Sequence, residues 1–127
     1  MNKKEFNQST INIFTGLDIP GEYVAKNAKG AKKKFYSASQ SLKSSLKKSL
    51  WEQWIRLSME EINNCSSYRE SCMAWENSPA TSFVKNLALE KMLSLTEKKK
   101  CIMHIFDTSP DDSLVKRLAF KKFLSIH

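Results

Sequence analysis

Glycine and proline are scarce in this chain, which contains only three residues of each type among 127. All the glycines lie within the first 30 residues, so we expect long helices after that point. Residues 1–20 mix short apolar pieces with polar and turn residues, which predicts an extended arm. Pro20 can occupy the first turn of a short helix over residues 20–28, and Gly30 would end that helix.

Cysteine and histidine are also few. The cysteines are Cys65, Cys72 and Cys101, and the histidines are His104 and His127. An odd number of widely spaced cysteines favours reduced thiols over a disulfide framework. Because no Cys-x2-Cys pair provides the spacing of a structural zinc site, we expect no metal and no other cofactor. No nucleophile and base stand at a spacing that indicates catalysis, so we expect that the protein is not an enzyme.

Long apolar runs are absent as well. No run reaches the roughly 18 residues needed to span a bilayer, and residues 1–6 lack the apolar region of a secretory signal. These absences predict a cytoplasmic protein. The length and the 41% of apolar residues suffice for one core, which predicts a single helical domain over residues 1–127.

The helical period is the strongest structural signal in the sequence. Between Ala31 and about Asn63 apolar residues recur at steps of three or four, which predicts one long helix. The recurring residues are Phe35, Ala38, Leu42, Leu46, Leu50, Trp54 and Leu57. At about 100° per residue most of them share one stripe, which should face the core while the lysines occupy the other faces.

Further helices are predicted by apolar spacing and by capping residues. A short helix contains residues 68–75, and Thr96 can cap another one that contains residues 101–106. Ser78-Pro79 and Ser109-Pro110 each place a hydroxyl before a proline, which is typical of a helix start. The sequence therefore predicts an all-α fold, an irregular bundle of five or six helices with an extended N-terminal arm.

What the chain has in excess is lysine, concentrated in one segment. No acidic residue lies between Glu22 and Glu52, and the eight lysines there equal the formal net charge of +8. These residues are Lys26, Lys29, Lys32, Lys33, Lys34, Lys43, Lys47 and Lys48. Serines interleave with them and supply further donors to phosphate oxygens. Such a patch attracts polyanions, although a charge run can also be only a solvated helix face.

Two further basic sets are Lys98, Lys99 and Lys100, and Lys116, Arg117, Lys121 and Lys122. In the second set, Lys116, Arg117 and Lys121 lie close together around a predicted helix. With residues 97–106 as a first helix, the short connection allows a helix-turn-helix, in which this basic helix would enter a groove of DNA. Trp51 and Trp54 follow the lysine run and could stack on bases, but aromatic residues at helical spacing more often belong to the core. We therefore favour the core for both tryptophans.

One short stretch carries a family resemblance. Tyr68, followed by Ser71, Cys72 and Trp75, resembles the aromatic, small-small, tryptophan pattern of the PerC-like transcriptional regulators of enteric bacteria. The resemblance covers about eight residues, and that family usually has alanines at the positions of Ser71 and Cys72. It transfers no functional residue to this chain.

The leading hypothesis is a small non-enzymatic protein, a regulator or an accessory subunit of a nucleoprotein complex, that binds DNA or RNA through its lysines. Because lysines outnumber arginines eighteen to three, the charge suits contacts to the phosphate backbone better than the reading of base edges. The alternative is a protein-protein adaptor or inhibitor that presents the same basic face to an acidic partner surface. A membrane surface is less favoured, because the apolar stripe is needed for a core.

Overall fold

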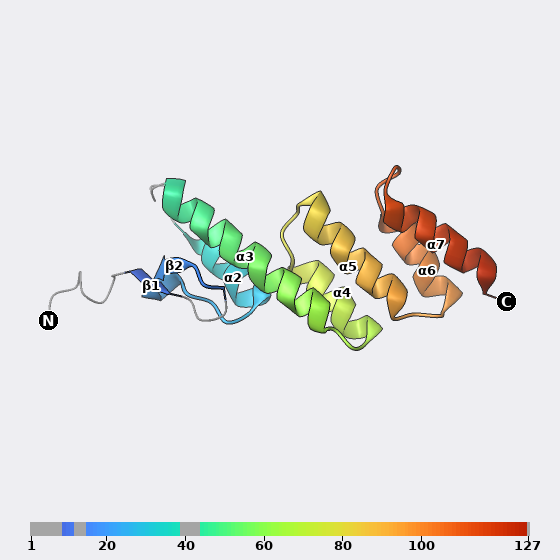
Figure 1. Ribbon diagram of the computed structural model, residues 1–127, viewed down its shortest axis with the longest axis horizontal. Coiled ribbons are helices and arrows are strands. Elements are labelled where there is room, and N and C mark those ends of the chain that lie inside the picture. The colour runs from blue at the N-terminus through green and yellow to red at the C-terminus, as the bar shows by residue number, and fades with distance from the viewer. Residues whose placement is uncertain (1–8, 12–14, 39–43, 127) are drawn as a thin grey trace, which may run out of the picture. The chain divides into compact units, whose positions relative to one another are not determined.

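The computed structural model describes residues 9–11, 15–38 and 44–126, with side chains for residues 15–38 and 45–126 (Figure 1). Within these residues two short strands and one 3-10 turn precede six α-helices, which confirms the predicted all-α fold. The elements are β1 (Ser9–Ile11), β2 (Asp18–Pro20), η1 (Gly21–Tyr23), α2 (Ala28–Ser37), α3 (Ser44–Asn64), α4 (Tyr68–Asn77), α5 (Ser82–Ser94), α6 (Lys99–Thr108) and α7 (Leu114–Ser125).

The described part of the predicted arm forms an antiparallel pair of strands. Thr10 in β1 lies opposite Ile19 in β2, and the Ile19 side chain is fully buried. The predicted short helix over residues 20–28 is wrong, because only η1 forms there. Gly30 does not end a helix but lies in the first turn of α2, where its N–H donates to the N-cap side chain of Asn27 at 2.7 Å. This bond satisfies one of the amides that a helix start leaves open.

The predicted continuous helix from Ala31 to about Asn63 is also wrong, because α2 ends at Ser37 and α3 begins at Ser44. Ala38, the C-cap residue, has ψ 134° and is therefore extended. Residues 37–49 contain six serines, whose hydroxyls compete for backbone hydrogen bonds and lower helix propensity. The apolar period continues across the break because both helices turn an apolar face to one shared core. The predicted stripe residue Leu42 lies outside the described residues.

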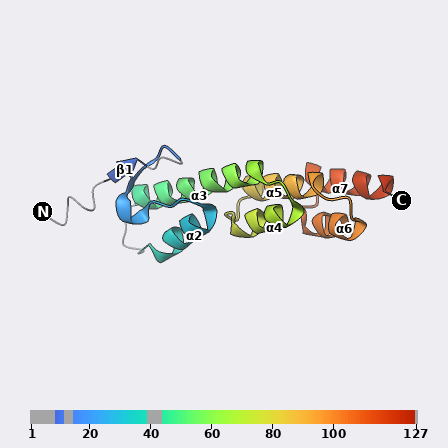
Figure 2. The same ribbon diagram turned by 90° about the horizontal axis from the view of Figure 1, so that it is seen from below.

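Contacts divide the chain into two compact units, residues 1–61 with 77–79 and residues 62–76 with 80–127. In the first unit α2 packs beside α3 (Figures 1 and 2). Three alanines, Ala25, Ala28 and Ala31, lie in one core cluster with Trp54 and Leu57, and their small side chains allow the helix to approach the large indole. The single domain over residues 1–127 stays a prediction.

A buried amide side chain connects the start of the α2 segment to α3. Gln53 is fully buried, and its Oε1 accepts from the Ala25 N–H at 3.1 Å. The Gln53 Nε2 donates to the Tyr23 carbonyl at 3.0 Å. At the first residue of α2, the Ala28 N–H donates to a carboxylate oxygen of Glu61. These bonds hold the backbone that leads into α2, and therefore orient the lysines which that helix carries.

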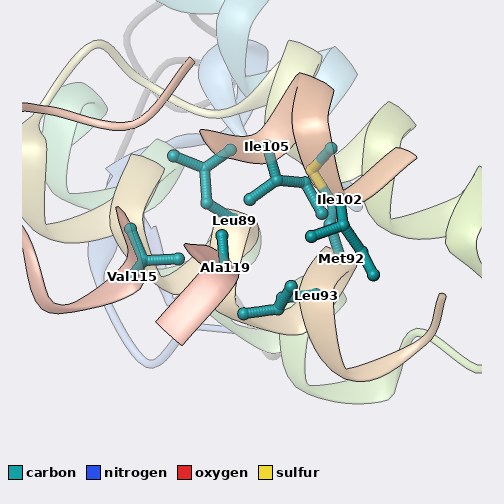
Figure 3. Close-up of a cluster of buried hydrophobic side chains, with 7 residues drawn as sticks. All are labelled: Leu89, Met92, Leu93, Ile102, Ile105, Val115 and Ala119. Carbon is teal, nitrogen blue, oxygen red and sulfur yellow. The ribbon is translucent and has the colours of Figure 1, made fainter. Parts of the chain in front are cut away.

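The second unit has its core where α5, α6 and α7 meet (Figure 3). Seven buried side chains, which point toward one another, form this core cluster: Leu89, Met92, Leu93, Ile102, Ile105, Val115 and Ala119. Tyr68, Cys72 and Trp75 from the predicted helix α4 pack against it. Helices α6 and α7 run side by side in opposite directions (Figures 1 and 2).

The predicted caps of the last helices are wrong, although the helices exist. The side chain of Thr81 accepts from the Val84 N–H and caps α5. The side chain of Ser113 accepts from the Lys116 N–H and caps α7. A residue before proline is pushed toward extended conformations, so Ser109, with ψ 146°, ends α6 instead of starting α7. Thr96 accepts from the Lys98 N–H at 3.2 Å, but Lys98 is the N-cap residue of α6.

Candidate nucleic-acid interface

The outer face of α2 carries the densest group of described lysines. Ala28, Ala31 and Phe35 turn toward the core of the first unit. At about 100° per residue, Lys29 and Lys33 lie on the opposite side of the helix, and both are exposed. The remaining lysines of this segment are exposed Lys26, just before the helix, and half-buried Lys32 and Lys34. Five of the eight lysines of the acid-free segment are therefore on or next to this one short helix.

Tyr36 lies on the same face of α2, and sequence analysis missed it. Its side chain is 68% exposed, the largest exposed fraction among the exposed large apolar and aromatic residues of the described chain. Tyr36 follows Lys32 by four residues and Lys33 by three, so it neighbours both on the helix surface. Its ring packs edge-on with those of Phe35 and Trp54, at centroid distances of 5.4 and 5.7 Å. The sequence feature that indicates its exposure is its position on the helical wheel, away from the apolar stripe.

The lysines of α3 divide between two environments. Lys47 is half-buried, and its Nζ lies 5.9 Å from the centroid of the Phe35 ring, so it lies next to the C-terminal half of α2. Lys48 is exposed and is rotated by about 100° from Lys47 around the helix axis. Lys43 lies outside the described residues. The structure thus brings Lys47 close to α2. The prediction had instead placed Lys33, Lys43, Lys47 and Lys48 on one continuous helix.

The lysines of α2 carry charge that is not neutralised within the described residues. The ion pairs found there join Glu52 with Arg56, Asp111 with Lys116, and Glu97 with Lys122, and none contains a lysine of this helix. Like charges four residues apart, as at Lys29 and Lys33, destabilise a helix by about 0.2–0.5 kcal/mol. The bound carboxylate at the N-terminus of α2 belongs to Glu61 and faces the Ala28 amide. The α2 face is therefore a concentrated positive surface.

The tryptophans of α3 have the core positions that the helical period favoured. Trp54 is 2% exposed, and its Nε1 donates to the Asn77 carbonyl at 2.6 Å. Trp51 is half-buried, with its ring centroid 5.4 Å from that of Trp54. A ring buried in this way offers no face to a base, so Tyr36 is the better stacking candidate in this unit.

The second predicted basic set lies on α7, in the other unit. Lys116 pairs with Asp111 at 3.2 Å, and its Nζ lies 4.6 Å from the centroid of the Phe106 ring. Arg117 and Lys121 are exposed. The antiparallel course of α6 and α7 differs from a DNA-binding helix-turn-helix, whose helices cross at about 90–120°. The structure therefore gives no support to a recognition helix at this place.

Three titratable side chains of the second unit, Tyr68, Cys72 and Cys101, lie close together. The pKa of the Tyr68 phenol is held above its ordinary value of 10.0, mainly by burial and further by hydrogen bonds with Cys72 and Cys101. The phenol therefore stays protonated at neutral pH. His104 is exposed. Among the described residues no group of three His, Cys, Asp or Glu side chains is placed to hold a metal ion.

No helix in the described parts of the chain combines the length and the apolar character needed to cross a membrane. Comparison with known proteins found no matching family model, no matching curated protein and no matching solved structure. Function is therefore inferred from the residues of the α2 face and their surroundings.

Proposed function

We propose that this protein binds nucleic acid through the outer face of α2, without catalysis. The observation that carries the proposal is the surface formed by Lys29, Lys32, Lys33 and Tyr36, whose lysines are in none of the ion pairs of the described chain. Lysine ammonium groups bind phosphate oxygens as point charges and release condensed counterions. This contact is independent of base sequence, so the protein should bind many sequences with similar affinity.

The exposed ring of Tyr36 favours single strands over duplex. A base in a duplex is stacked on both sides, whereas a base in a single strand can leave its neighbours and stack on an aromatic side chain. Such stacking contributes about 1–3 kcal/mol per base. A lysine face with one exposed aromatic ring fits a single strand that runs along α2, with phosphates on the ammonium groups and one base on the phenol.

The test is a salt titration of binding with a fluorescent single-stranded oligonucleotide and with the matching duplex. The triple variant Lys29→Gln, Lys32→Gln, Lys33→Gln should reduce the slope of log K against log salt by about 2 for the single strand, because each phosphate contact contributes about 0.7. The matched control replaces Lys98, Lys99 and Lys100, all exposed on the second unit, with glutamine. Both variants lose the same charge, so only a local site distinguishes them.

The stacking contact has its own comparison. Tyr36→Ala should weaken single-strand binding about 5- to 150-fold and leave duplex binding almost unchanged, while Tyr36→Phe should keep the affinity of the parent. Equal slopes for the two triple variants would refute a site on α2. If neither nucleic acid binds, while an acidic protein surface is bound through the same lysines, the adaptor alternative replaces this proposal.

A further inference from the structure

The second unit exposes a group of large apolar side chains on its terminal hairpin. Of the large hydrophobic residues that are exposed among the described residues, five belong to α6 and α7. They are Met103, Leu114, Leu118, Phe120 and Leu124, with exposed fractions between 40% and 63%. Single exposed apolar residues are common, but a contiguous group is typical of an interaction site.

Hollows lie along both sides of this surface. One, of about 760 Å³, lies between α5 and α7 and is lined by Leu93, Leu114, Leu118 and Lys121 among others. A second, of about 580 Å³, is lined by α6, by α7 and by Asp111 in the connection between them, and it shares Leu114, Leu118 and Lys121 with the first. The shared residues form a ridge with a groove on each side, which is the relief that a second helix can pack against.

The exposed side of α7 consists of three rows. Leu114 and Leu118 form one apolar row, and Phe120 and Leu124 form the other, each with a spacing of four residues. At about 100° per residue, Arg117 and Lys121 lie between these rows. Both are exposed, and neither belongs to an ion pair of the described chain. A positively charged row therefore runs through the middle of an apolar surface.

We infer that this face of α7 binds an amphipathic helix of a partner protein, one that carries carboxylates within its apolar stripe. The leucine and phenylalanine rows provide the apolar contact, and Arg117 and Lys121 select acidic side chains at its centre. The proposal is independent of nucleic-acid binding on the other unit. It assigns Arg117 and Lys121 to protein recognition instead of phosphate.

The charges argue against other occupants of this face. In a membrane-surface helix the cations flank the apolar face and reach the headgroups, whereas here insertion would carry Arg117 and Lys121 into the hydrocarbon region. A symmetric pair of this chain would place the same basic row of each copy in one interface, where like charges repel. The outside of a duplex consists of phosphates, sugars and base edges, which cannot cover an apolar row. The bases of a single strand stack on aromatic rings, whereas Leu114, Leu118 and Leu124 in these rows are aliphatic.

The fold argues that the partner segment is helical. An extended peptide needs hydrogen-bond partners for its backbone, which such ligands usually find at the open edge of a sheet. The described part of the second unit contains only helices and their connections. A helix satisfies its own backbone groups and brings only side chains to the grooves beside α7.

The test uses the full chain and two labelled helical peptides of about 18 residues, or five turns. Both carry a stripe of leucines that is interrupted by charged residues. These charged residues are glutamates in one peptide and lysines in the other. Fluorescence anisotropy should give a Kd of about 1–100 µM for the glutamate peptide and at least tenfold weaker binding for the lysine peptide. Arg117→Glu with Lys121→Glu should reverse this order, which an unfolded variant cannot do.

The apolar rows are tested with a matched pair of double variants. Leu114→Ser with Leu124→Ser should weaken binding of the glutamate peptide at least tenfold. Met73→Ser with Phe83→Ser should leave that binding unchanged, because these two residues are equally exposed but lie on α4 and α5. Equal binding of both peptides, no binding below about 100 µM, or equal losses in both double variants would overturn the inference. So would dimerisation, or binding to phosphatidylserine vesicles or to an oligonucleotide, that depends on Leu114 and Leu124.

Discussion

The buried amide of Gln53 offers the sharpest test of how the α2 face is held in place. Gln53→Met keeps a flexible side chain of similar length but removes the acceptor of the Ala25 N–H and the donor to the Tyr23 carbonyl. The variant therefore changes the segment that leads into α2 without touching any lysine. Its effect on binding must then be indirect.

The expected loss of stability follows from the burial of these groups. Removing one partner of a buried hydrogen bond leaves the other group desolvated, at a cost of about 1–3 kcal/mol. Ala25 is 5% exposed, so its amide should contribute fully, while the half-buried Tyr23 allows water to replace part of the lost bond. We expect the free energy of unfolding to fall by about 2–4 kcal/mol in total.

Urea unfolding followed by tryptophan fluorescence measures this loss, since Trp51 and Trp54 report on the first unit. Hydrogen exchange should also show that the Ala25 amide loses protection at low urea, through local opening of this segment. Glu60→Met, an exposed change on the same helix, is the control and should stay within about 0.5 kcal/mol of the parent. A Gln53→Met variant that behaves like this control, with Ala25 still protected, would refute the structural role of the amide.

Two further outcomes test the core and the packed phenol. Leu50→Ala should destabilise the first unit by about 2–5 kcal/mol, because Leu50 is fully buried. Leu46→Ala should cost about 1 kcal/mol, because Leu46 is half-buried. Equal losses of stability in urea titrations would contradict this difference in burial. The folded pKa of Tyr68 lies above its ordinary 10.0, so the unfolded state loses its proton first and stability should fall as the pH rises above about 10. Tyr68→Phe should make the urea midpoint less sensitive to pH between about 9 and 11, and an unchanged sensitivity would show that the phenol is not desolvated.

The helical class and the core of α3 were predictable because they depend on local periodicity. Leu50, Trp54 and Leu57 repeat at steps of three or four, and all are buried in the structure. The break after Ala38 was not predictable by that criterion, since α2 and α3 present apolar residues in the same apparent phase. The serines that accompany the break were interpreted as phosphate donors, although serine also weakens a helix.

Helix caps and turns were predicted less well, because a serine-proline dipeptide is compatible with both the end and the start of a helix. Ser109 before Pro110 has the residue types of a helix start, yet its hydroxyl donates to the Ile105 carbonyl and its backbone ends α6. Which of the two occurs depends on where the next apolar residues meet the core. Ser113, four residues after Ser109, caps the helix that brings Val115 and Ala119 into that core.

By itself the sequence determined three properties of this protein: an acid-free segment rich in lysine, a scarcity of helix-breaking residues, and apolar residues spaced for helices. Those properties depend on residue type and on neighbours along the chain. Only the tertiary structure decided which charges remain open, since Lys122 is paired with the distant Glu97 while Lys29 and Lys33 lie free of the described ion pairs. It also decided that Tyr36 is exposed while Trp54 is buried. Exposure and pairing arise from contacts between segments far apart in sequence, and no local pattern contains them.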